Sequence, residues 1–573
     1  MSPLDQLLER ITNHLVVIYG EGDHEALRDG LVDAMHLREH FYEPVPYSDH
    51  WSERDVTLIT YGDSIVGEGK PLHVLHEFLG KHLEGILSTV HILPYFPSTS
   101  DDGFAVSDYL GVNPELGAWE DIEAIAFEYR LMSDLVVNHC SASHEWFQQY
   151  QRGEEPGASF FIEASPEEDL SAVIRPRTTP LLRPTGDKHV WCTFGHDQID
   201  LNFREPRLLL ELVKIIRGHL DHGISMFRLD AIAFVWKEIG TSCINLRQTH
   251  EIVRLFRTLI EHVKPDGVII TETNIPNREN LSYFGNFNEA HSIYNFSLPP
   301  LLLHALSTGT CLYLRRWLMS MPPAQPGTTY FNFIASHDGI GLRPAEGLLG
   351  IEQIDELVEK MKSNGGRVSE RTLPDGSTRP YEINISLFDA FQGDDGLGEA
   401  RFLCAHSVLL ALEGMPAFYI HSLLGTRNDE AKAEASGHNR HVNRHQWDAA
   451  ALEEALADPG NPHARVLSKL KKLIEIRTSQ SSFHPNATQF TLHLGEEVFG
   501  LWRQSLDRRQ NIFCLHNLSD KEKIIPLTSV NLVTTDEWFD LLSGQDLSEE
   551  MTELRFAPYQ SMWLASKLKI LPY

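Results

Sequence analysis

The sequence predicts an α/β protein built on a closed (β/α)8 barrel, with an added segment at each end and two insertions. Eight short apolar runs of strand character recur between residues 56 and 420. Most of them are separated by segments long enough for a helix, which is the order of a parallel barrel. Several runs end in polar groups, as a buried strand does where it leaves the core.

The length and the composition indicate a multidomain globular protein. The chain has 573 residues, of which 42% are hydrophobic, and its formal net charge is −31. Such a charge repels nucleic acid and anionic membranes, so we expect neither as a partner. An anionic substrate such as phosphate would need a local group of arginines. The longest largely apolar stretch, 402–412, is too short to span a bilayer.

The cysteines and the N-terminus indicate a cytoplasmic location. The six cysteines are scattered and form no CxxC pair, which is typical of reduced thiols without a disulfide framework or a zinc site. The first residues are amphipathic with mixed charge and lack the basic-then-apolar order of a signal peptide.

Along the chain, residues 1–52 are expected to form a helical extension, because Leu7, Leu8, Ile11 and Leu15 recur at helical spacing. Residues 53–480 are expected to form the barrel, with helices at 207–221 and 246–263. The sequence predicts its strands at 56–61, 89–95, 131–138, 226–234, 267–273, 293–298, 330–335 and 416–420.

Two gaps between predicted strands are too long for a single crossover. They predict inserted subdomains at about 140–204, after strand three, and about 340–393, after strand seven. Both would lie at the C-terminal face of the barrel, where βα loops build active sites. Beyond residue 480 the pattern changes to short strands separated by turns, which predicts a C-terminal antiparallel β domain over 481–573. Its strands are expected at 490–494, 498–502, 511–515, 532–535 and 560–564.

Three carboxylates are expected at one mouth of this barrel. Asp230, Glu272 and Asp338 are expected at the ends of the predicted strands four, five and seven. Cleavage of a glycosidic bond requires one ionised carboxylate to attack the anomeric carbon and one protonated carboxyl to protonate the departing oxygen. A separation of about 5–5.5 Å favours the double displacement that retains configuration.

Four segments carry a family resemblance. In order and spacing, residues 134–139, 227–231, 270–274 and 335–339 resemble the signature regions of the α-amylase superfamily, glycoside hydrolase family 13. The resemblance implies that Asp230 is the nucleophile, Glu272 the acid/base and Asp338 a carboxylate that binds sugar hydroxyls. Arg228 would hold Asp230 ionised. His139 and His337 can donate to sugar hydroxyls.

Further segments narrow the resemblance. Residues 57–63, 90–96, 240–243, 298–309 and 443–445 are similar to the sucrose phosphorylase family, which transfers an α-glucosyl group to inorganic phosphate and releases α-glucose 1-phosphate. The resemblance implies phosphate contacts from the 175–177 segment, through Arg177, and from Tyr381. It implies a glucose subsite of Asp101, Phe104, His139, Phe194, Arg228, His337, Asp338 and Arg440.

The chain departs from sucrose-specific members at the acceptor side. Phe234 stands where they have Tyr, and Glu382 stands where they have Gln. Residues 380–384, 51–56 and the helical extension resemble the glucosylglycerate phosphorylase branch, in which the leaving group is glycerate. A carboxylated leaving group needs a cation, for which Arg343 is the first candidate and Lys237 the second. Glu382 would repel glycerate unless it pairs with an arginine or binds a hydroxyl.

The sequence therefore predicts a retaining α-glucosyl phosphorylase of 2-O-α-D-glucosylglycerate. Phosphorylases of glucosylglycerol or sucrose, and a retaining hydrolase of the same fold, remain as alternatives. A non-catalytic sugar-binding barrel is a further alternative, although such proteins usually lack one of the three carboxylates. No organic cofactor or metal is implied. The expected partners are a small α-glucoside and inorganic phosphate. The N-terminal extension could cover the barrel or form a subunit contact, so a homodimer is a further alternative.

Overall fold

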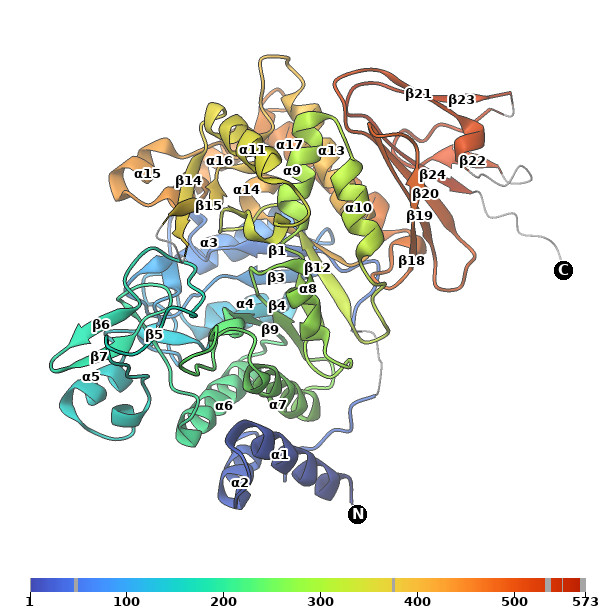
Figure 1. Ribbon diagram of the computed structural model, residues 1–573. Coiled ribbons are helices and arrows are strands. Elements are labelled where there is room, and N and C mark those ends of the chain that lie inside the picture. The colour runs from blue at the N-terminus through green and yellow to red at the C-terminus, as the bar shows by residue number, and fades with distance from the viewer. Residues whose placement is uncertain (1, 46–49, 374–376, 531–536, 549, 567–573) are drawn as a thin grey trace.

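The computed structural model describes residues 2–45, 50–373, 377–530, 537–548 and 550–566 (Figure 1). Its centre is a closed parallel barrel with the strand order β1-β16-β12-β11-β10-β9-β4-β3. Each of the eight predicted runs overlaps one barrel strand, which confirms the predicted fold. The strands are β1 (Thr57–Thr60), β3 (Thr89–Ile92), β4 (Arg130–Val136), β9 (Met226–Asp230), β10 (Val268–Thr271), β11 (Ser292–Tyr294), β12 (Thr329–Phe333) and β16 (Met415–Tyr419).

The barrel strands are buried on both faces, because helices cover the outside and side chains fill the inside. Every residue of β1, β9 and β10 is buried, which explains why these strands read as continuous apolar runs. Outside them lie α6 (Pro206–Asp221) and α7 (Arg247–Val263), close to the predicted helices. Helix α6 begins with proline at its first position, after Glu205, whose side chain caps the helix.

All eight predicted strands extend past the observed C-terminal ends, and three of them extend into a helical segment. Strand β9 ends at Asp230, and Ile232–Phe234 is a 3-10 turn. Helix α9 (Leu298–Thr308) and helix α14 (Ile420–Leu423) each begin at what was predicted as the last residue of a strand. These residues are buried in either conformation, so an apolar pattern alone does not mark the change from strand to helix.

Both insertions emerge at the C-terminal ends of barrel strands, as predicted (Figure 1). The segment after β4 contains two hairpin-like sheets, and the segment after β12 contains one three-stranded sheet. The first comprises β5 (His139–Ser141), α5 (Glu145–Arg152), β6 (Leu182–Thr185), β7 (Lys188–Trp191) and β8 (Gln198–Asp200). The second comprises β13 (Ile340–Gly341), α11 (Ile351–Ser363), β14 (Arg367–Thr372), β15 (Thr378–Asn384) and α12 (Leu387–Ala390).

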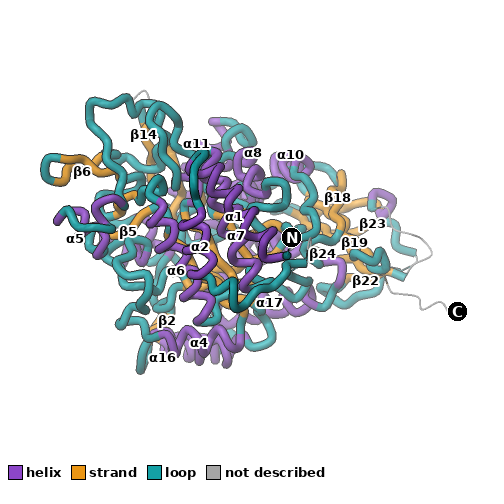
Figure 2. The backbone as a smooth tube through the Cα atoms, turned by 90° about the horizontal axis from the view of Figure 1, so that it is seen from below, coloured by secondary structure: helices purple, strands orange, loops and turns teal. Residues whose placement is uncertain are grey.

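The N-terminal extension lies on the outside of the barrel, away from the mouth. Helices α1 (Pro3–Tyr19) and α2 (Glu25–Ala34) lie beside α7 and α6, as both views show (Figures 1 and 2). The buried His14 binds the carboxylate of Glu251 on α7 at 2.6 Å. The extension is helical only up to Ala34, and the described residues that follow, up to residue 52, form turns and extended chain.

The C-terminal segment forms antiparallel sheets beside the barrel (Figure 1). The main sheet contains β18 (Thr488–His493), β19 (Val498–Gln504), β20 (Asn511–Asn517), β24 (Ser561–Ser566) and β22 (Trp538–Asp540), of which four match predicted strands. The fifth prediction, 532–535, lies outside the described residues. A second, unpredicted sheet pairs β21 (Lys523–Pro526) with β23 (Glu553–Phe556).

These sheets enclose a small core of their own, which includes Phe513, Leu515 and Leu564. This core supports our proposal that 481–573 is a unit of its own, beside the proposed units 1–52 and 53–480. In the described part of the chain, no helix combines the length and the apolarity that a bilayer crossing requires.

Candidate active site

One pocket at the mouth of the barrel brings the three predicted catalytic carboxylates together. Asp230 ends β9, Glu272 directly follows β10 and Asp338 follows β12. Most of the other predicted site residues line the same pocket, namely Asp101, Phe104, His139, Arg177, Phe194, Arg228, Phe234, His337, Arg343, Tyr381 and Arg440. The pocket also includes residues that the sequence did not single out, namely Pro176, Gln198, Ala231, Thr273 and Asn274.

Arg228 on β9 connects the carboxylates at the floor of the pocket. Its Nη1 donates to Asp230 Oδ1 at 2.9 Å and to Asp134 on the neighbouring strand β4. Its Nη2 lies 3.7 Å from Glu272 Oε2. A single buried guanidinium therefore holds carboxylates from three neighbouring strand segments in one arrangement.

The residue after Asp230 completes this arrangement. Ala231 adopts a left-handed conformation with φ 48°, which is uncommon for a residue with a Cβ. Its backbone N–H donates to Glu272 Oε2 at 3.0 Å. A left-handed conformation of this kind typically costs about 1–3 kcal/mol. Here it occurs at the residue whose N–H binds Glu272, so the backbone beside Asp230 is tied to the side chain of Glu272.

Burial controls the protonation of this pair. It raises the pKa of Glu272, and it raises the pKa of Asp230 well above its usual range; Arg228 acts in the opposite direction on both. The sequence predicts that Arg228 holds Asp230 ionised, but the effect of burial on the pKa of Asp230 exceeds that of Arg228. Two close carboxyls that both resist ionisation favour a state with one proton between them. Glycosyl transfer through a covalent intermediate requires this combination of one carboxylate and one carboxylic acid.

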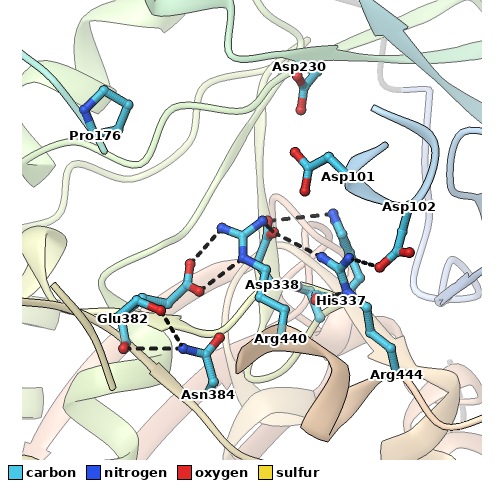
Figure 3. Close-up of polar contacts among 12 residues, drawn as sticks. Asp101, Asp102, Pro176, Asp230, His337, Asp338, Glu382, Asn384, Arg440 and Arg444 are labelled. Carbon is cyan, nitrogen blue, oxygen red and sulfur yellow. Dashed lines mark hydrogen bonds and ion pairs between the residues drawn. The ribbon is translucent and has the colours of Figure 1, made fainter. Parts of the chain in front are cut away.

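Asp338 has the opposite character. Burial acts to raise the pKa of Asp338, but Arg440, 2.5 Å away, and His337 outweigh it and hold the pKa well below its usual range. The carboxylate is therefore ionised and can accept hydrogen bonds from a ligand. Figure 3 shows Asp338 beside Arg440 and His337, with Asp101 and Asp230 approaching from other segments of the chain.

The sugar side of the pocket combines rings with fixed polar groups. Phe104 stacks on His337 with ring centroids 5.2 Å apart. The ring of Phe194 lies 5.3 Å from that of His139, whose pKa is lowered by burial. Gln198 Nε2 donates to Asp101 Oδ2 at 3.0 Å and so fixes the orientation of that carboxylate. No sequence pattern distinguishes Gln198 from other strand residues of the first insertion.

The opposite wall carries two arginines that face the pocket without a carboxylate partner among the described residues. Arg177 lies over the rings of Phe194 and Tyr381, with its guanidinium carbon 5.6 and 5.9 Å from the centroids. Arg343 is 9% exposed, and burial lowers its pKa. None of the ion pairs in the described part of the chain involves Arg177 or Arg343.

Asn274 lies on this wall two residues after Glu272. Its Oδ1 is buried and accepts no hydrogen bond from a described residue. Gly341 packs directly against this amide, because a Cβ at Gly341 would lie 2.8 Å from both Oδ1 and Nδ2. The segment 270–274 stands out in the sequence because of Glu272. Asn274 is the last residue of that segment, and its position there is the only sequence signal that could have identified it as a site residue.

Two predicted residues are not among those that line the pocket. Lys237 is buried beside it and binds Asp200 Oδ2 at 2.6 Å and Asn138 Oδ1 at 2.7 Å. Glu382 is buried and accepts two hydrogen bonds from Arg440, at 3.0 and 2.7 Å. The expected conflict between Glu382 and an anionic ligand is therefore resolved by pairing with an arginine.

Comparisons with known proteins agree with this geometry. Residues 83–338 match the family model of the α-amylase catalytic domain. The chain is 44% identical over 525 residues to a glucosylglycerate phosphorylase from Allomeiothermus silvanus, covering 90% of this chain and 91% of that protein. A glucosylglycerate phosphorylase from Spirochaeta thermophila is 40% identical, with 98% and 99% covered. A solved sucrose 6F-phosphate phosphorylase from Thermoanaerobacter thermosaccharolyticum superposes with a TM-score of 0.72 at 25% identity, covering 88% of this chain and 98% of that one.

Proposed function

The chain belongs to the sucrose phosphorylase family of the α-amylase superfamily, on the glucosylglycerate phosphorylase branch, and from this premise we propose that it is a retaining α-glucosyl phosphorylase. It converts 2-O-α-D-glucosylglycerate and phosphate to α-D-glucose 1-phosphate and D-glycerate, reversibly. The substrates are small molecules. The six buried, unpaired cysteines support a reducing, cytoplasmic setting.

The proposed reaction has two displacements. In the first, Asp230 attacks the anomeric carbon while Glu272 protonates the departing glycerate oxygen, so that the glycosidic bond breaks and a glucosyl ester forms. In the second, a phosphate oxygen attacks the same carbon and the bond to Asp230 breaks, with Glu272 as the base that takes up the phosphate proton. The shared hydrogen bond network of Arg228 and Ala231 supports these roles, because it places both carboxyls at one point of the pocket.

The observation that carries the proposal is a pair of pocket arginines that form no ion pair with any carboxylate in the described part of this acidic protein. With a net charge of −31, most of the chain repels an anion. Arg177 and Arg343 offer two guanidinium groups on the acceptor wall, and guanidinium geometry suits both phosphate and carboxylate. A phosphorylase with an anionic leaving group uses two anions in turn. A hydrolase, or a phosphorylase with a neutral leaving group, needs at most one.

We assign Arg177 and Tyr381 to phosphate, and Arg343 to the glycerate carboxylate. Tyr381 lies on β15 beneath the guanidinium of Arg177, which supports a joint role. Arg343 follows β13, and Gly341 on that strand lies against the amide of Asn274, whose buried Oδ1 has no hydrogen-bond partner among the described residues. This neighbourhood supplies a cation and a polar amide to a small hydroxy acid. The buried position of Lys237, between Asp200 and Asn138, favours Arg343 over Lys237 for this task.

The test is the product formed from glucosylglycerate with and without phosphate. The proposal predicts that α-glucose 1-phosphate accumulates in proportion to added phosphate, with little free glucose. Free glucose as the sole product would establish a hydrolase instead. The reverse reaction from α-glucose 1-phosphate, run over D-glycerate, glycerol, fructose and glucose, identifies the acceptor. A preference for glycerol or fructose over glycerate would refute the assignment of the leaving group.

A further inference from the structure

Glu382 binds the pocket arginine Arg440 through both of its carboxylate oxygens. Its Oε1 and Oε2 accept from Nε and Nη2 of Arg440 at 3.0 and 2.7 Å, which is a bidentate pair. The third nitrogen, Nη1, lies 2.5 Å from Asp338 Oδ1. Figure 3 shows Arg440 held between Glu382 on one side and Asp338 on the other. The plane of the guanidinium is therefore fixed by two carboxylates from different segments.

Glu382 and its neighbour Tyr381 serve different contacts. They are consecutive on β15 at a β-bulge, where Glu382 is opposite Ser369, Pro380 is opposite Glu370 and Tyr381 is the extra residue. Tyr381 lines the pocket, whereas Glu382 is only 2% exposed and faces Arg440. Glu382 is thus placed to act on the arginine, and a ligand in the pocket meets Arg440 and Tyr381.

Gly339 creates the room for this contact. It directly follows Asp338, and a Cβ built there would lie 2.5 Å from Glu382 Cγ and 2.7 Å from the backbone oxygen of Ile383. Both distances are too short for any side chain. The close approach of β15 to the strand end that carries Asp338 therefore requires glycine at this position.

The contact leaves Arg440 with N–H groups that no described residue accepts. Of the five N–H groups of a guanidinium, one on Nε and one on Nη2 donate to Glu382, and Nη1 forms an ion pair with Asp338. The other N–H groups belong to Nη1 and Nη2, and Arg440 lines the pocket with the ionised Asp338. The arrangement presents donors and an acceptor side by side, which suits a pair of sugar hydroxyls.

We infer that Glu382 is a positioning residue for the glucosyl group: it orients Arg440 toward sugar hydroxyls and takes no part in recognising the acceptor. This inference rests on the proposed glucosyl transfer. It assigns the difference between Glu382 and the glutamine of sucrose-specific relatives to the sugar side of the pocket. The acceptor side is left to Arg343, Asn274 and Arg177.

The test uses donors that need no natural acceptor. α-D-Glucosyl fluoride and its 3-deoxy and 4-deoxy analogues are compared as substrates with phosphate, in the wild type, Glu382→Gln and Glu382→Asp. Glu370→Gln is the matched control, because Glu370 lies on the partner strand β14, is exposed and forms no ion pair with a described residue. Gly339→Ala displaces Glu382 by a second route. Thermal unfolding of each variant checks that it is folded.

We expect Glu382→Gln to lower kcat/KM for glucosyl fluoride by about 10- to 100-fold, the worth of a hydrogen bond to a charged group. For at least one deoxy donor, Glu382→Gln should lower kcat/KM by less than about threefold, because that donor lacks the hydroxyl that Arg440 binds. The kcat/KM of Glu382→Asp for glucosyl fluoride should lie between those of the wild type and Glu382→Gln, because aspartate keeps the charge. The glycerate-to-glycerol ratio in the reverse reaction should stay within about twofold.

Two results would overturn the inference. One is an equal loss on glucosyl fluoride and both deoxy donors, since a merely structural role of Glu382 affects all donors alike. The other is a changed glycerate-to-glycerol ratio with unchanged use of glucosyl fluoride, since that places Glu382 at the acceptor. If the wild type prefers an acceptor other than glycerate, the proposed leaving group fails but the fluoride comparison still tests Glu382.

Discussion

Replacing Arg343 by alanine should separate acidic from neutral acceptors. The guanidinium is 9% exposed, so water screens its interaction with a bound carboxylate only weakly. Hydrogen bonds to a charged group contribute about 1.5–3 kcal/mol, and truncating one partner of a buried charged pair costs roughly 2–5 kcal/mol. We therefore expect a loss of about 2–4 kcal/mol, or roughly 30- to 900-fold in kcat/KM, for D-glycerate. Glycerol has no carboxylate and should lose less than about fivefold.

The assay is phosphate release from α-glucose 1-phosphate with D-glycerate or glycerol at constant ionic strength. Arg371→Ala is the matched control, because Arg371 lies in the same insertion but is already paired with Glu346. The control should leave the glycerate-to-glycerol ratio unchanged. If Arg343→Ala lowers both acceptors equally, the carboxylate does not bind there and the reasoning from an unpaired buried cation is refuted.

Three further predictions concern protonation and buried charge. Glu272→Gln should lower phosphorolysis of glucosylglycerate by about 10²- to 10⁴-fold and turnover of α-glucosyl fluoride far less, because fluoride departs without a proton; equal losses would remove Glu272 as the acid. Lys237→Ala should lower the free energy of unfolding by about 3–5 kcal/mol in urea, because it strands the buried Asp200, and a shifted acceptor ratio would restore Lys237 to the acceptor site. Burial raises the pKa of Glu413 from 4.5 to about 7. Between pH 4.5 and about 7, Glu413 therefore stays protonated in the folded state but is ionised in the unfolded state. The free energy of unfolding falls as the pH rises through this range. Glu413→Gln, which cannot ionise, should be more stable than the wild type at pH 8 by up to about 3 kcal/mol and equal to it near pH 4; an advantage that does not grow with pH would contradict this.

The sequence was sufficient for the barrel and for the chemistry at its floor. Parallel strands leave a barrel at one face, so carboxylates that end successive apolar runs must meet there. Asp230, Glu272 and Asp338 do so. The C-terminal limits of the strands were less predictable. The residues after Asp230 are apolar and buried like those of the strand, and only the left-handed φ of Ala231 ends it.

The outer wall was harder to predict because its contacts join distant segments. Glu382 and Arg440 are 58 residues apart, and the sequence could state only that Glu382 needed an arginine or a hydroxyl. Lys237 is a reasonable candidate cation by sequence alone. The structure pairs it with Asp200, which belongs to the first insertion and is distant from Lys237 in the sequence. Gln198 and Asn274 carry no charge, and their importance follows from what they face in the folded chain.

The position of Arg228 has a consequence for engineering new acceptors. Its charge is divided among Asp134, Asp230 and Glu272, so a change at any one of them alters the other two and their effects cannot add independently. The turn at Arg343 shares none of these bonds, whereas Tyr381 and Glu382 on β15 are assigned to phosphate and to Arg440. A library confined to that turn can therefore explore leaving groups while the reacting centre stays intact.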